Sequence, residues 1–367
     1  MPFRQHRSSI NAKLIYLCAF LFLLISFSLS ACSSGGGGSD DGGGSQNSNN
    51  ILSGDYQFDL LFNDGSSDWN QINAVTFDGS GGYDADISYD STGDSGSTSG
   101  TYTVGTDGVV TFTGTDIVGL ASADGSLVAV SDTDPDGGVD SDISLGIAVK
   151  AGSGMSAASL SGTYIICQIR RDDERVKASR MEFTFDGAGA ASGSILKDSD
   201  DSTGSFTGTY TVAADGAFAM DITGLAKEFE GQVASDGNLL LVLDTEDDGE
   251  VLMMVGVKTG SGMDDSDLSG DYQMHQFGGD ASGPWTTRID MTADGAGSLT
   301  ADILADSGDD LTDPPAMAYT VSANGMFTIT GSDNFGQVSA DGEVFVVVDS
   351  DTTGDGDVML SIGIKKS

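Results

Sequence analysis

Three features of the sequence together predict an all-β fold made of three tandem antiparallel units with about eight strands each. The chain of 367 residues contains 53 Gly but only 5 Pro, and 19% of its residues are charged. This composition favours many tight turns over coiled coils and long helices. Apolar residues alternate with polar ones at a period of two, which is typical of strands. Finally, short sequence markers recur 108 residues apart, as at Tyr56, Tyr164 and Tyr272.

The first 31 residues are expected to be a signal peptide. Arg4, Arg7 and Lys13 precede an apolar stretch over residues 14–29. A basic segment followed by a short apolar one is the pattern of a secretory signal, and this stretch is too short to span a membrane comfortably.

The end of this stretch, Leu29-Ser30-Ala31-Cys32, resembles the lipobox of bacterial lipoproteins. The resemblance implies cleavage before Cys32 and acylation of that residue, so that the mature chain is held at a membrane without crossing it. Cys32 is followed by Ser33 and not by Asp, which by the same resemblance favours the outer membrane of the cell envelope. Residues 32–51 are rich in Gly and Ser and are expected to form a flexible tether.

The rest of the chain divides into three predicted repeats, residues 52–159, 160–267 and 268–367. Within a repeat, Met181, Phe183 and Phe185 alternate with polar residues, as in a half-buried strand, whereas residues 344–348 are apolar on both faces. Asp-Gly pairs separate such runs at hairpin spacing. A closed meander barrel and a two-sheet sandwich both fit eight short strands, and a six-bladed propeller remains an alternative. Aspartates at the strand ends argue against a transmembrane barrel.

Each repeat opens with a Gly-x-Tyr motif, for example Gly54 to Tyr56. This opening and the meander order weakly resemble lipocalin-like and avidin-like barrels. The resemblance implies only the fold, because none of the ligand residues of those families matches. The tyrosines of these motifs are expected to pack in the core.

An acidic loop late in each repeat is the candidate metal site. Carboxylates at alternate positions next to a Gly can converge on one Ca²⁺, which prefers oxygen ligands. The first loop opens like a helix-loop-helix calcium motif but lacks the glutamate of its last position. The alternative, which this departure favours, is that Asp and Gly are simply turn residues on an acidic surface. The candidate ligands are Asp132, Asp134, Asp136, Asp244, Glu246, Asp248, Asp349, Asp351 and Asp355. A second acidic loop, beginning at Asp90, Asp198 and Asp306, lacks the alternate spacing and is expected to be a solvated turn.

The loop after the first strand of each repeat is the candidate ligand-binding site. Trp69 and Trp285 lie two repeat lengths apart, and the middle repeat has a basic cluster instead. A tryptophan at the mouth of a β scaffold can stack on a sugar ring or cap a cavity. The alternatives are that each Trp closes its own core and that the bases pair with nearby acids. The candidate residues are Trp69, Arg170, Arg171, Arg175, Lys177 and Trp285.

Several functions are disfavoured. With 56 acidic against 15 basic residues, the net charge is −41, and such a chain repels nucleic acid. Cys167 lies in an apolar run and is expected to be a small buried hydrophobe. His275 is the only histidine after residue 31, so a Ser-His-Asp arrangement cannot recur among the repeats, and the chain is not expected to be an enzyme.

The sequence therefore predicts an envelope lipoprotein that presents three tandem β domains as non-catalytic binding modules. The expected partners are the membrane, through the lipid, and a polar or carbohydrate-like ligand or another envelope protein. The alternative is a structural or adhesive surface spacer stabilised by calcium.

Overall fold

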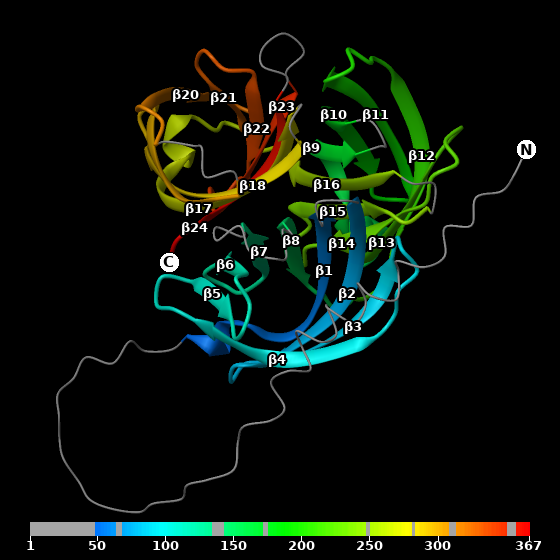
Figure 1. The fold of residues 1–367 in the computed structure, drawn as a ribbon. Coiled ribbons are helices and arrows are strands. Elements are labelled where there is room, and N and C mark those ends of the chain that lie inside the picture. Colours follow the sequence, from blue (N-terminus) through cyan, green and yellow to red (C-terminus); the bar gives the residue numbers. More distant parts are fainter. Residues whose placement is uncertain are drawn as a thin grey trace, which may run out of the picture. The chain divides into compact units, whose positions relative to one another are not determined.

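The computed structural model describes residues 48–63, 68–133, 143–171, 175–246, 250–280, 283–307, 313–350 and 357–367. All of them belong to one compact unit, residues 46–367. This unit contains three closed eight-stranded antiparallel barrels, one after another along the chain (Figure 1). The prediction of three all-β units with about eight strands is confirmed, and the barrel is the correct alternative. The expected signal peptide, Cys32 and most of the tether lie outside the described residues. Within the described ranges, no helix is both long and apolar enough to cross a membrane.

The strands of each barrel pair in sequence order, and the last closes on the first. The first barrel comprises β1 (Ser53–Asn63), β2 (Asp68–Asp78), β3 (Gly82–Asp90), β4 (Ser97–Val104), β5 (Val109–Phe112), β6 (Val118–Ala121), β7 (Leu127–Asp132) and β8 (Ile143–Lys150). The second comprises β9 (Ser161–Arg171), β10 (Val176–Asp186), β11 (Ala190–Asp198), β12 (Ser205–Val212), β13 (Ala217–Ile222), β14 (Phe229–Val233), β15 (Leu239–Asp244) and β16 (Val251–Lys258). The third comprises β17 (Ser269–Asp280), β18 (Gly283–Asp294), β19 (Ser298–Asp306), β20 (Met317–Val321), β21 (Met326–Ile329), β22 (Asn334–Val338), β23 (Val344–Ser350) and β24 (Val358–Lys365).

A short 3₁₀ helix before the first strand closes one end of each barrel: η1 (Asn49–Ile51), η2 (Ala157–Ser159) and η3 (Asp265–Asp267). The leucine after each helix, such as Leu52, is fully buried. The hydroxyl of Tyr102 donates to the carbonyl oxygens of Asn49 and Leu52, and Tyr210 and Tyr319 make the matching bonds in the other barrels. The tyrosines of the opening Gly-x-Tyr motifs, Tyr56, Tyr164 and Tyr272, are buried in the barrel interiors, as predicted.

The turn between the sixth and seventh strands lies against the same end. In the first barrel the hydroxyl of Tyr56 donates to the carbonyl oxygen of Gly125 at 2.5 Å. Gly125 has a φ of +68°, and a Cβ there would overlap the carbonyl oxygen of Ile51. Both the positive φ and the close approach require glycine, which explains the Asp-Gly pair at this turn.

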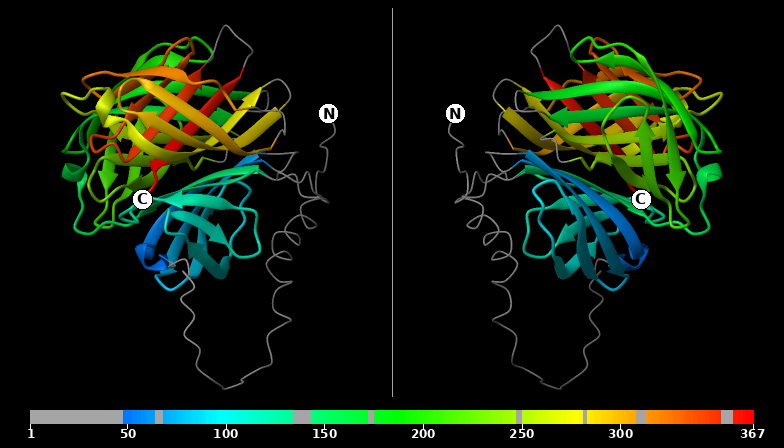
Figure 2. Two further views of the ribbon diagram at one scale, coloured as in Figure 1. Left: turned by 90° about the vertical axis from the view of Figure 1, so that its left-hand side faces the viewer. Right: turned by 90° about the vertical axis from the view of Figure 1, so that its right-hand side faces the viewer.

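The barrels use both faces of their strands. Tyr56 and Phe77 fill the inside of the first barrel, and separate clusters fill the second and third. The outward faces form one further apolar cluster that contains residues of all three barrels, for example Leu145 of the first, Val255 of the second and Ile362 of the third. This sharing explains why some strands are apolar on both faces. Figure 2 shows the three sets of strands from two further sides.

Polar contacts link the barrels head to tail. Asn70 of the first barrel donates to the carbonyl oxygen of Asp244 in the second at 2.8 Å. Thr286, which occupies the position of Asn70 in the third barrel, donates to the carbonyl oxygen of Asp132 in the first at 2.8 Å. Between the second and third barrels, the Arg180 guanidinium lies over the Phe335 ring at 4.3 Å. In each case a residue of the barrel's second strand contacts the sixth or seventh strand of the next barrel. The third barrel contacts the first in this way, so the three domains form a closed pseudo-threefold ring.

Candidate functional site

The predicted calcium loops are only partly described. Asp132, Asp244 and Asp349 lie at or near the ends of the seventh strands β7, β15 and β23. Glu246 follows β15, and its backbone N–H donates to Asp244 at 3.0 Å. The candidate ligands Asp134, Asp136, Asp248, Asp351 and Asp355 lie outside the described residues.

Asp244 already has a cationic partner. Its carboxylate is buried and lies 2.7 Å from the Lys227 ammonium, which also lies 2.9 Å from Glu250. Among the described residues, no three His, Cys, Asp or Glu side chains are grouped so that they could hold a metal ion. Calcium binding therefore stays a prediction.

The tryptophans lie at the barrel ends opposite the 3₁₀ helices, but in strands and not in loops as the sequence suggested. Trp69 is in β2 and stacks on Phe62 of β1, with ring centroids 4.0 Å apart and planes 10° from parallel. Trp285 is in β18 and covers Gly278 of β17, where a Cβ would overlap the indole ring. Both indoles are half-buried. Each one packs across the first hairpin, because cross-strand partners share a face.

The predicted basic cluster is an ion-pair network at the matching end of the second barrel. Arg170 lies 3.3 Å from Glu250, 3.5 Å from Asp200 and 3.7 Å from Asp198. Lys177 and Arg175 also pair with Asp200. These bases thus pair with acids at the end of β11 and before β16 of the same barrel. The interleaved acids of residues 172–174, with which local pairing was the alternative, lie outside the described residues.

Arg171 differs from the rest of the cluster because it forms an ion pair with a residue of another barrel. Its guanidinium lies 2.6 Å from Asp68 of the first barrel. It therefore adds a charged contact to the ring.

The second acidic loop was expected to be a solvated turn, and this prediction is wrong for its first residue. Asp90, Asp198 and Asp306 are buried. Asp90 accepts hydrogen bonds from the Thr92 backbone and from Gln71, and Asp198 accepts from Ser179. Asp90 and Asp198 thus cap their turns and tie them to the second strand, and Asp306 accepts a hydrogen bond from Thr287 of its second strand. A count of acidic residues cannot reveal these roles.

One position in the first strands carries three buried polar groups. Asp59, Cys167 and His275 occupy equivalent places in β1, β9 and β17, and each is 0% exposed. Burial raises the pKa of the Cys167 thiol to about 12, so it is a packed hydrophobe and not a nucleophile. The Nδ1 atom of His275 lies 2.9 Å from the Ser131 hydroxyl of the first barrel. A comparison of the repeats at the 108-residue offset could have found this position.

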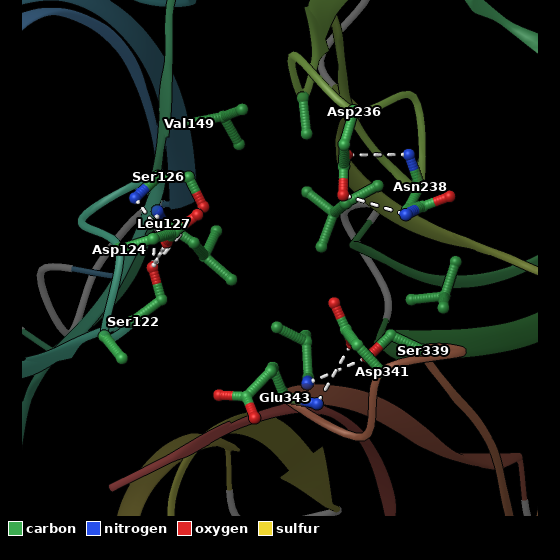
Figure 3. Close-up of a pocket in the computed structure, with 15 residues that line it drawn as sticks. Ser122, Asp124, Ser126, Leu127, Val149, Asp236, Asn238, Ser339, Asp341 and Glu343 are labelled. Atoms are coloured by element: carbon green, nitrogen blue, oxygen red, sulfur yellow. Dashed lines mark hydrogen bonds between the residues drawn. The ribbon is translucent and has the colours of Figure 1, made fainter. Parts of the chain in front are cut away.

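A cavity of about 380 Å³ lies where the three barrels meet. We call it the axial cavity. It is lined by the turn between the sixth and seventh strands of every barrel, and the carboxyl groups of Asp124, Asp236 and Asp341 occupy equivalent places in these turns. Figure 3 shows the three groups of side chains facing one another across the centre. No sequence motif predicts this site. Each turn resembles an ordinary Asp-Gly hairpin, and the three turns come together only in the ring of barrels.

Aliphatic side chains form the rest of the axial cavity. Leu127, Leu239 and Val344 begin the seventh strands of the three barrels, and Val149 and Val257 lie beside them. Four of these side chains belong to the shared apolar cluster, and Val344 packs against it. The cavity therefore has an apolar wall that continues into the core and acidic groups in the turns.

The turns hold their carboxylates in place with local hydrogen bonds. Asp124 accepts from the Ser126 backbone at 2.9 Å and from the Ser122 and Ser126 hydroxyls at 2.7 Å. Burial raises the pKa of Asp124, but these hydrogen bonds outweigh burial and hold it below the ordinary value. Asp236 accepts from both nitrogens of Asn238. The groups are fixed before any ligand arrives, which lowers the entropic cost of binding.

A scan of protein-family models and a search of curated proteins both find no match. Among solved structures, the chain is similar to transferrin binding protein B from serogroup B Neisseria meningitidis, at 11% identity and a TM-score of 0.31. That match covers 82% of this chain and 66%, just under two thirds, of the other. A mutant of the same protein from Haemophilus parasuis matches at 10% identity over 85% and 75% of the two chains, with a TM-score of 0.31. A protein of unknown function from Nostoc punctiforme matches at 12% identity over 57% and 98%, with a TM-score of 0.23. These TM-scores are too low to carry an argument about function.

Proposed function

We propose that this chain is a non-catalytic binding protein of the bacterial envelope, anchored through a lipid on Cys32, and that it binds its ligand in the axial cavity. The observation that carries the proposal is the convergence of three equivalent turns, one from each barrel, on a cavity of about 380 Å³. Concave sites with apolar walls and a few fixed polar groups are where small ligands usually bind.

The axial cavity is a better candidate than the barrel mouths. At the mouths, Trp69 is stacked on Phe62 and Arg170 is paired with three carboxylates. A ligand there would have to break these contacts. In the axial cavity, a ligand would cover aliphatic surface without displacing any protein contact, and each Å² of apolar surface it covers contributes about 25 cal/mol.

The ring also bears on the number of binding sites. Three independent domains joined by flexible linkers would carry three separate sites. Domains that share one apolar cluster and close head to tail instead make a single site that none of them contains alone. This arrangement supports one binding protein over an extended spacer.

The test is a thermal-shift screen of the full chain in a non-ionic detergent, repeated with Val344→Trp. The indole would fill the axial cavity from a partly exposed position. A ligand at a hundred times its dissociation constant adds about 2.7 kcal/mol of stability. The proposal expects compounds that stabilise the wild type but not Val344→Trp. If every hit stabilises both proteins equally, ligand binding in this cavity is refuted.

A further inference from the structure

The walls of the axial cavity carry two kinds of surface that together define a ligand class. We infer that the cavity takes a small organic cation with an aliphatic body, such as an alkylammonium ion. This inference rests on the proposed function and adds to it the chemistry of the ligand.

The first argument is uncancelled negative charge. Four carboxyl groups line the cavity, those of Asp124, Asp236, Asp341 and Glu343, and no Lys, Arg or His is among the described lining residues. The donors that reach the three aspartates are all neutral: backbone N–H groups, serine hydroxyls and the Asn238 amide. Glu343 has one distant base, Lys365 at 3.9 Å. A cationic ligand gains from this field, and an anion is repelled.

The second argument is the aliphatic wall, which a bare ion could not use. Leu127, Leu239 and Val344 reach the cavity from three barrels. A metal ion needs several oxygens within bonding distance, and the described acidic side chains are not grouped in that way. A ligand that satisfies both surfaces needs an apolar body as well as a positive charge.

The third argument is size. Leu127 and Leu239 are only 4% and 7% exposed, so only a slender group can reach these side chains. The three aspartates of the turns are exposed. The volume of about 380 Å³ is near the lower end for ligand cavities, which begin at roughly 300 Å³. A short alkyl chain with one charged head fits these limits, whereas the surface of a folded partner does not.

Three probes with one chain length separate charge from apolar burial: hexylammonium, hexanoate and hexanol. Each is titrated calorimetrically into the full chain in a non-ionic detergent, with a micelle blank. Two variants accompany the wild type. Asp236→Asn with Asp341→Asn removes two charges but keeps one oxygen in each turn to accept the backbone N–H. Val344→Trp fills the cavity.

A control variant changes the net charge by the same amount elsewhere. Asp107 and Asp215 lie in the turns between the fourth and fifth strands, outside the cavity, and each accepts a hydrogen bond from the backbone two residues later. Asp107→Asn with Asp215→Asn therefore controls for the general loss of two negative charges.

We expect hexylammonium to bind at least tenfold more tightly than hexanol, and hexanoate to bind more weakly than either. The Asp236/Asp341 variant should bind hexylammonium about tenfold more weakly, as expected for two charges near the ligand in a partly hydrated site. The affinity of this variant for hexanol should equal that of the wild type. The control variant should bind hexylammonium as tightly as the wild type does. If the three probes bind equally but fail with Val344→Trp, the ligand class is wrong and the proposed function stands. If no probe binds, or Val344→Trp changes nothing, both fail.

Discussion

Replacement of Asp59 by Asn should stabilise the protein, and should do so more strongly as the pH rises. Asp59 lies in β1 on the face that meets the second barrel and is fully buried. Its Oδ1 accepts a hydrogen bond from the Gln57 amide at 2.9 Å, and its Oδ2 has no hydrogen-bond partner among the described residues. Burial, with a smaller contribution from Glu230, raises the pKa of this carboxyl from its ordinary 3.8 to about 8.

The raised pKa determines the sign and size of the effect. Below pH 3.8 the carboxyl is protonated in both folded and unfolded chains. Between pH 3.8 and about 8 the unfolded chain loses the proton while the folded chain keeps it, so the free energy of unfolding falls as the pH rises. At about 1.4 kcal/mol for each pKa unit, the loss reaches about 4 kcal/mol at pH 7. Asn keeps the shape and the oxygen that Gln57 uses but does not ionise.

The assay is urea unfolding of the wild type and Asp59→Asn at pH 4, 5.5, 7 and 8.5. The difference in unfolding free energy should be small at pH 4, grow by about 1.4 kcal/mol for each pH unit, and level off above pH 8. Asp84→Asn, exposed on β3, controls for the loss of one negative charge. A difference that does not depend on pH, or a matching slope in Asp84→Asn, would refute the reasoning.

Four further predictions follow from the same structure. Burial lowers the pKa of His275 to about 3, so the wild type should lose stability as the pH falls from 6.5 toward 3. His275→Gln should remove about 3 kcal/mol of that loss at pH 4 in urea unfolding, and an unchanged acid slope would contradict this. Asn70→Ala and Thr286→Ala should each cost about 1 kcal/mol, because each removes a hydrogen bond between barrels; unchanged stability would speak against the ring. Millimolar calcium should raise the melting temperature above that in chelator, and coincident melts would exclude the calcium loops. Acrylamide should quench Trp69 and Trp285, since both are half-buried, whereas fully shielded tryptophans would count against the barrel mouths as binding sites.

The barrels could be predicted from the sequence because their signals are local and repeated. The period of two in residues 181–185 and the Asp-Gly turns specify strands and hairpins, and the 108-residue offset specifies three copies. The closed barrel could not be distinguished from a sandwich, because both bury one face of each strand. The distinction depends on β8 pairing with β1, a contact between residues about 90 positions apart that no local pattern encodes.

The candidate site could not be predicted, because it belongs to the contacts between repeats. Residues 344–348 are apolar on both faces, which indicates that the outward face is covered but not by what. Asp124, Asp236 and Asp341 each match an ordinary turn residue. Conversely, Trp69 and Trp285 are the only two tryptophans of the chain, which suggests a special role, yet both pack across their own hairpins.

The central claim is that three barrels build one binding site, and ligand contacts measured by NMR test it most directly. With methyl-labelled Leu and Val in the full chain, bound hexylammonium should show nuclear Overhauser effects to Leu127, Leu239 and Val344, one from each barrel, and lose them in Val344→Trp. Contacts to the methyl groups of a single barrel, or only to residues at the barrel mouths, would contradict the account.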